Sequence, residues 1–151
     1  MRGQSEPAKT GDPVWESIRA EATQEAAREP MLASFLHAAV LKHRVLEDSL
    51  SFHLAAKLAS STLPAMLVRE VIDEAFQAPD IGAAIRADLQ AVRTRDPATH
   101  GFSTPLLYYK GFHALQSYRV AHWLWERGRH SLAVFLQNRI SQVFGVDIHP
   151  A

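Results

Sequence analysis

The sequence predicts an all-α fold, a multi-helix bundle of about seven helices, and three observations support this prediction. Apolar residues recur at spacings of three and four over most of the 151 residues, as they do on the buried face of a helix. Proline or glycine stands between these segments, at positions where helices begin and end. The alternation that is typical of a strand is confined to residues 146–148, which are too few to establish one.

Composition narrows the class of protein. The length fits one domain with a core of its own. Sixteen basic and sixteen acidic residues cancel without long runs of one sign, so the charge pattern of a nucleic-acid binder is missing. The absence of cysteine excludes a disulfide framework and a thiolate metal site. Because the sequence also lacks a membrane-spanning apolar run and a signal-peptide core, we expect a soluble, cytoplasmic protein with no membrane or nucleic-acid partner.

The first helix is expected to begin at Pro13. Residues 1–11 are polar and resemble a disordered tail. Asp12 suits the N-cap, and Pro13 suits the first position, where the missing N–H would have had no partner in any case. The apolar stripe that follows consists of Val14, Ile18, Ala22 and Ala26, and Trp15 widens it.

Three helices are expected next. Pro30 begins a helix over 31 to about 43, and a third helix covers about 46 to 59. The fourth covers 65–76, and the residues that we expect it to bury are Met66, Leu67, Val71, Ile72 and Ala75.

A fifth helix is expected over 81 to about 93, with Pro79 stopping the fourth and Asp80 as the cap. The segment 94–104 contains Asp-Pro, glycine and several hydroxyls and predicts an ordered loop, a kind of segment that often carries function.

The most aromatic segment, 106–125, predicts one central helix. Ser103 or Thr104 can cap it, and Pro105 suits its first turn. Its apolar residues fall on nearly every side, which indicates burial among other helices. A last helix is expected over 132–144, with Gly145 as its C-terminal cap.

Several stretches carry a resemblance to a known family. They are PMLASFLHAAVLKH at 30–43, AVRTRDPAT at 91–99, STPLLYYKGFHALQSYRVAHWLW at 103–125 and FLQNRISQVFGVDIHPA at 135–151. From about Val14 to Ala151 the sequence resembles, in one register, the amino-terminal helical domain of the bacterial serine O-acetyltransferases. In that family the Asp-Ile-His-Pro motif opens a left-handed parallel β-helix of hexapeptide repeats. The resemblance therefore implies a tail at 1–11, a helical domain at 12–145 and the start of a truncated β-helix at 146–151.

The family transfers acetyl from acetyl-CoA to L-serine and so makes O-acetylserine for cysteine biosynthesis. Its catalytic histidine and its acetyl-CoA site belong to the β-helix, so we expect this chain alone to be inactive and to bind no cofactor. The resemblance implies a homo-oligomer of trimers that pair through the helical domain, with Val14, Trp15 and Ile18 as candidate interface residues. It also implies feedback inhibition by L-cysteine and binding of O-acetylserine sulfhydrylase by a carboxy-terminal tail outside this sequence.

Asp96 is the first candidate site residue. Residue type alone favours a turn carboxylate paired with Arg93 or Arg95. The resemblance instead implies substrate binding, because the matching aspartate of the family helps to bind serine and the same site accepts cysteine. A carboxylate is the natural partner for an amino acid's ammonium group.

Asp147 is the second candidate, and by itself its position indicates nothing. The resemblance implies a catalytic role, in which this aspartate would hold the family's histidine base in one tautomer and stabilise its imidazolium form. His149 is expected to be a turn residue at the domain junction rather than that base.

Two other classes of function remain as alternatives. The chain could be a non-catalytic helical oligomerisation module, or an unrelated helical bundle that binds DNA or a ligand, which would need a basic face or an apolar pocket. A metal site is not expected: His113 and His122 are nine residues apart, about 180° around a helix, and no HExxH pattern occurs.

Overall fold

The computed structural model describes residues 11–99 and 101–151, and over these residues the chain is helical and contains no strand. The predicted all-α fold is therefore confirmed. The expected tail at 1–11 lies, except for Gly11, outside the described residues. The elements are α1 (Pro13–Arg28), the 3₁₀ turn η1 (Pro30–Leu32), α2 (Ala33–Leu36), the π-helical η2 (His37–Leu41), α3 (Leu46–Leu58), α4 (Ala65–Phe76), α5 (Pro79–Arg95), α6 (Ser103–Tyr108), α7 (Lys110–Glu126) and α8 (His130–Phe144).

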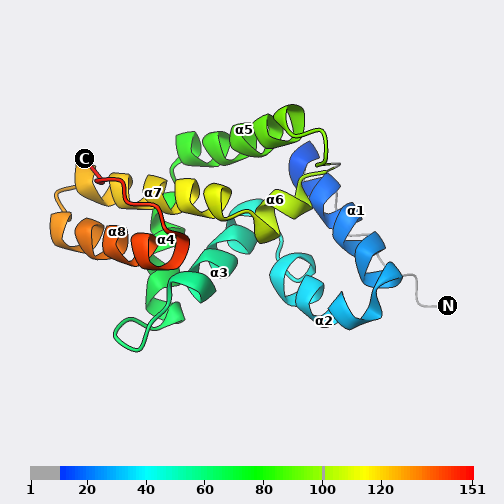
Figure 1. The fold of residues 1–151 in the computed structure, drawn as a ribbon, viewed down its shortest axis with the longest axis horizontal. Helices are drawn as coiled ribbons and strands as arrows, with labels where there is room; N and C mark the ends of the chain where they lie inside the picture. The colour runs from blue at the N-terminus through cyan, green and yellow to red at the C-terminus, as the bar shows by residue number, and fades with distance from the viewer. Residues whose placement is uncertain (1–10, 100) are drawn as a thin grey trace.

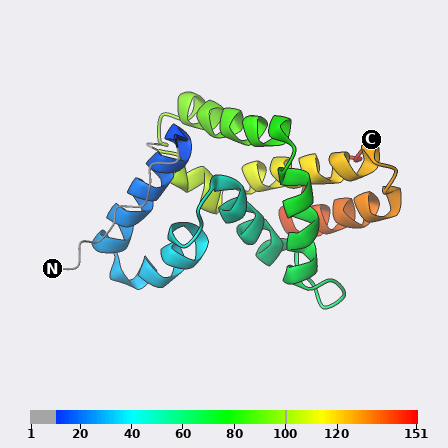
Figure 2. The ribbon, with the colours of Figure 1, turned by 180° about the vertical axis from the view of Figure 1, so that it is seen from behind.

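The helices form an elongated bundle. Figure 1 shows the antiparallel pair α7 and α8 at one end, α1 and α2 at the other, and α5 alongside α7. Seen from behind, α4 crosses the α7–α8 pair and α3 lies between the two ends (Figure 2). The loop from α5 to α6 lies next to α1, and the last residues run back along α7 (Figure 1).

One continuous core joins the two ends. Its largest fully buried side chains are Trp15, Ile18, Leu46, Leu50, Leu54, Leu58, Ile72, Ile85, Leu89, Leu106, Leu124 and His113. The predicted stripe of α1 is thus confirmed, but Val14, Trp15 and Ile18 pack inside this chain and are at most 5% exposed. Their proposed place in an interface between copies is therefore wrong, since a side chain in the intramolecular core cannot contact a second copy.

The predicted caps of α1 and α8 are confirmed. Asp12 accepts the Trp15 N–H at 3.3 Å, and it also accepts a 2.6 Å bond from Arg86 of α5. Gly145 ends α8 with a φ of 70°, a left-handed conformation that favours glycine.

The buried face of α4 and the start of α5 differ from what the sequence predicts. Met66 and Leu67, which were expected to be buried, are 75% and 44% exposed, because α4 instead turns Val68, Ile72 and the following turn toward the core. Helix α5 begins at Pro79 with Ala78 as its N-cap and no side-chain cap, so the predicted cap at Asp80 is wrong. Proline starts this helix without loss, because the first N–H of a helix has no intrahelical partner.

The predicted central helix is two helices. Tyr109 adopts an extended conformation, with φ −86° and ψ 111°, and separates α6 from α7. Ser103 and Thr104 lie inside α6 rather than capping it, since Phe102 occupies the N-cap without a side-chain hydrogen bond. This break largely explains why the described part has eight α-helices where about seven were expected.

Candidate functional site

Asp96 lies where α5 ends, in a turn that its own side chain stabilises. The carboxylate Oδ1 accepts the Ala98 N–H at 3.0 Å, and the Asp96 carbonyl accepts the Thr99 N–H at 3.0 Å. Aspartate followed by proline favours such a turn, because the side chain can bond to the backbone two residues on. The ordered loop predicted after the fifth helix is confirmed at this turn.

Two hydroxyl groups hold the other oxygen of Asp96. Thr99 Oγ1 donates to Oδ2 at 2.9 Å, Tyr109 Oη donates to it at 3.3 Å, and the two hydroxyls lie 2.9 Å apart. Hydrogen bonds from Thr99, Ala98 and, less strongly, Tyr109 lower the pKa of Asp96. The side chain is therefore a fixed, ionised carboxylate at neutral pH.

The alternative role for Asp96, an ion pair with Arg93 or Arg95, is not what the structure shows. Among the described residues neither arginine forms an ion pair with Asp96. The guanidinium of Arg93 instead stacks on the buried ring of Phe102, 4.8 Å from its centroid. Within the part of the chain that the structure describes, the negative charge of Asp96 is thus compensated by hydrogen bonds.

The helix break brings Tyr109 to Asp96, and two buried histidines stabilise the break. His113 Nε2 lies 2.6 Å from the carbonyl oxygen of Leu106, and His53 Nε2 lies 2.9 Å from that of Leu107. Both carbonyls belong to the last turn of α6, where a helix leaves carbonyls without an N–H partner. A carbonyl can only accept, so each Nε2 carries the proton.

These two rings, 5.0 Å apart between centroids, are held neutral. Burial lowers the pKa of His53, and burial together with the neighbouring His53 lowers the pKa of His113 to about 4. Sequence reasoning missed both residues, because it treated 106–125 as one helix and saw no unpaired carbonyl there.

Asp147 lies apart from Asp96. It is exposed, and its Oδ1 accepts a 2.9 Å bond from the Gln137 amide of α8. The two aspartates share no hydrogen-bond partner among the described residues, so the structure does not bring them into one cluster.

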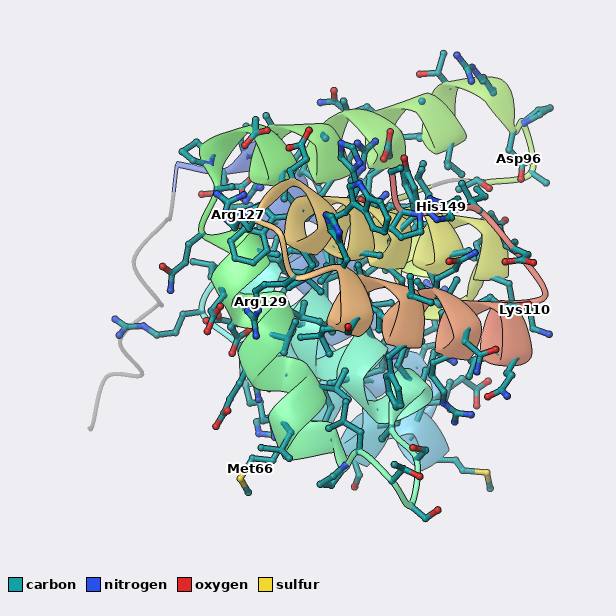
Figure 3. All side chains as sticks on the ribbon, turned by 90° about the vertical axis from the view of Figure 1, so that its left-hand side faces the viewer. Met66, Asp96, Lys110, Arg127, Arg129 and His149 are labelled. Carbon is teal, nitrogen blue, oxygen red and sulfur yellow. The ribbon has the colours of Figure 1, made fainter. Side chains whose placement is uncertain are left out.

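His149 lies on the carboxy-terminal segment. Its ring meets that of Trp125 edge to face, with centroids 4.8 Å apart, and its Nδ1 accepts the Ala151 N–H at 3.1 Å. Figure 3 shows Asp96 on the loop after α5 and His149 on the segment that passes over α7. The contacts of His149 are those of a turn residue that helps to hold this segment on α7.

The described residues contain neither a cluster of metal ligands nor a membrane-spanning helix. No group of three or more potential metal ligands occurs in the described part of the chain. Within the same residues, no helix combines the length and apolar character needed to cross a bilayer.

Comparison with known proteins identifies a family. The family model described as "Serine acetyltransferase, N-terminal" matches residues 14–117. The serine acetyltransferase of Salmonella typhimurium is 58% identical over 146 residues, which are 96% of this chain and 54% of that protein. The chain thus spans about half the length of the curated relatives it matches.

Solved structures show the same fold. A serine acetyltransferase in complex with CoA matches with a TM-score of 0.90 and 57% identity, over 91% of this chain and 59% of that one. A serine acetyltransferase in complex with cysteine matches with a TM-score of 0.88 and 57% identity, over 91% of this chain and 54% of that one. The serine acetyltransferase of Neisseria gonorrhoeae in complex with serine matches with a TM-score of 0.89 and 49% identity, over 93% of this chain and 58% of that one. The chain therefore belongs to the serine acetyltransferase family and corresponds to the amino-terminal helical domain of its members.

Proposed function

We propose that this chain is the helical part of an enzyme that transfers acetyl from acetyl-CoA to the hydroxyl of L-serine and so makes O-acetylserine for cysteine biosynthesis. Its membership of the family supports the reaction, and the related structures that hold CoA and serine support the two substrates. The observation in this chain that carries the proposal is the carboxylate of Asp96, which is ionised and fixed by Thr99 and Tyr109.

Asp96 would bind the ammonium group of serine. A carboxylate offers about four acceptor positions, and the turn and the two hydroxyls use three of them. A charged donor can use the remaining position, and its bond to an ionised acceptor is stronger than one between neutral groups. Cysteine carries the same ammonium group, so it would compete at the same place and act as an inhibitor.

Asp147 would act on the reacting proton through a histidine. One of its oxygens is bonded to Gln137, and the side chain is exposed, so a second domain could place an imidazole against it. An aspartate in that position fixes the tautomer of the base that takes the proton from the serine hydroxyl. Residues 146–151 would then be the first residues of the β-helix that supplies the histidine and the acetyl-CoA site.

Assembly and location are part of the proposal. The enzyme would be a cytoplasmic homo-oligomer of trimers that pair through the helical domain, and a carboxy-terminal tail would bind O-acetylserine sulfhydrylase. Two large apolar residues of η1 and α2, Met31 and Phe35, are 93% and 38% exposed. They replace the buried residues of α1 as candidates for the contact between copies, and they support the oligomerisation module as the second candidate function.

An acetyl-transfer assay tests the proposed reaction. The chain alone should consume no acetyl-CoA in the presence of serine. The same chain joined after Pro150 to the remaining half of the Salmonella typhimurium relative, referred to below as the joined enzyme, should do so. Serine-dependent turnover by the chain alone, free of other acetyltransferase, would contradict the assignment of the cofactor site to a second domain. A soluble, helical joined enzyme without activity would contradict the proposed role of this chain.

A further inference from the structure

The loop that carries Asp96 is held at a second point, where its last residue is bonded to α1. Glu21 of α1 accepts the Phe102 N–H with both oxygens of its carboxylate, at 2.9 and 3.3 Å. Phe102 is the last residue of the loop and the N-cap of α6, and its ring is only 5% exposed. The Glu21–Phe102 contact therefore fixes the end of the loop to a helix that lies 81 residues earlier in the chain.

This contact depends on the residue next to Phe102. A Cβ at Gly101 would lie 2.6 Å from Glu21 Cδ and would overlap with Oε1. The carboxylate of Glu21 therefore occupies the space that any side chain at 101 would need. Because the obstructing atoms are the end of a flexible side chain, an alanine at 101 would be accommodated by displacing the Glu21 carboxylate. Such a change would break the contact and leave the helices in place.

The two ends of the loop are thus held from different sides. Thr99 and Tyr109 hold the carboxylate of Asp96 at the beginning of the loop, and Glu21 holds the backbone of Phe102 at its end. A loop fixed at both ends samples fewer conformations, and a binding group that is already in position loses less entropy when its ligand arrives.

We propose that Glu21 is a positioning residue for Asp96, acting through Gly101 and Phe102 on the loop that would bind the ammonium group of the amino-acid substrate. This proposal rests on the proposed function of Asp96. Glu21 itself does not contact the substrate. Its loss should therefore weaken serine binding by less than the about 10- to 150-fold that direct loss of a charged hydrogen bond produces.

Kinetics of the joined enzyme provide the first test. Glu21→Ala and Gly101→Ala should each raise the KM for serine about 3- to 10-fold, a range equivalent to loss of part of one charged hydrogen bond. The KM for acetyl-CoA and kcat should stay within twofold. The double variant should be no worse than the more affected single variant, because both changes break the same contact. Additive effects, or a parallel change in both KM values, would overturn the proposal.

Two further variants of Glu21 and its helix sharpen this test. Glu21→Gln keeps one acceptor oxygen and should retain most of the serine affinity. Glu25→Ala, one turn further along α1, removes a carboxylate whose ion pair among the described residues is with Arg28 at 3.5 Å on the surface, and it should have no effect. If Glu25→Ala raised the KM for serine as much as Glu21→Ala does, the negative charge of α1 and not the contact to Phe102 would determine the affinity for serine.

Amide exchange separates failure of this inference from failure of the proposed function. In the joined enzyme, Glu21→Ala and Gly101→Ala should each speed hydrogen exchange of the segment that contains the Phe102 amide at least about tenfold, since the amide loses its acceptor. If Asp96→Asn raises the serine KM and Glu21→Ala does not, the inference is wrong and the function of Asp96 stands. If Asp96→Asn leaves the serine KM unchanged, the proposed function fails. Unchanged exchange in both variants overturns the contact itself.

Discussion

Acid should destabilise this domain through His113, and the loss should begin at pH values above those at which carboxylates titrate. The ring is 1% exposed, donates to Leu106, and has its pKa lowered from 6.5 to about 4 by burial and by the neighbouring His53. Between these two values the unfolded chain binds a proton that the folded chain does not. Stability is therefore fully present above pH 6.5 and is lost as the pH falls toward 4.

The magnitude follows from the same two values. When the pKa of a group differs by one between the folded and the unfolded chain, the free energy of unfolding can change by about 1.4 kcal/mol. The complete loss of unfolding free energy from His113 is therefore roughly 3 kcal/mol, and about 2 kcal/mol of it should be lost between pH 7 and pH 5. Against a total stability of about 5–15 kcal/mol this is a large effect. His53 and His43, whose pKa values are also lowered chiefly by burial, change stability in the same direction.

Urea unfolding of the 151-residue chain at pH 7, 6 and 5 measures this effect. His113→Gln removes the titrating ring and should lower stability at pH 7 while clearly reducing the further loss at pH 5. His37→Gln, at an exposed position, is the matched control and should keep the original pH dependence. A His113 variant with the same loss between pH 7 and pH 5 as the unaltered chain would refute this reasoning.

Three further predictions concern other parts of the chain. Tyr109→Phe removes the hydroxyl that donates to Asp96, and it should raise the serine KM of the joined enzyme about 2- to 10-fold in initial-rate measurements. An unchanged KM would show that this hydrogen bond does not matter for binding. Gly145→Ala places a side chain at a φ of 70° and should lower the free energy of unfolding by about 1–2 kcal/mol, seen as a Tm lower by a few degrees. An unchanged Tm would show that the end of α8 does not need a left-handed glycine. Replacing Met31 and Phe35 with serine should lower the oligomeric state in sedimentation without loss of helical content, whereas a monomeric unaltered chain would exclude this interface.

The sequence predicts those features that depend on neighbouring residues. The start of α1 is set by Asp12 and Pro13, the end of α8 by Gly145, and the turn at Asp96 by its own side chain and the proline that follows, so each could be expected from local rules.

The features that the sequence does not predict depend on partners far along the chain. The break at Tyr109 interrupts a pattern that predicts one helix. The last carbonyls of α6 are paired with His53, which is 54 residues from Leu107, and with His113. The need for glycine at Gly101 comes from a carboxylate of α1, since a Cβ at this position would overlap with Glu21 Oε1. Helical periodicity contains no information on either contact, since it records which residues share a face and not what that face meets.

The substitution Asp96→Asn in the joined enzyme tests the central claim most directly. It removes the charge and nearly preserves the shape, so the loss of a charged hydrogen bond to the substrate's ammonium group should cost roughly 1.5–3 kcal/mol. The KM for serine and the inhibition constant for cysteine should both rise about 10- to 150-fold, while the KM for acetyl-CoA should hardly change. If Asp96 only stabilised its turn, Asn would lower the Tm and disturb both substrates together. An unchanged serine KM with unchanged cysteine inhibition would remove Asp96 from the binding site.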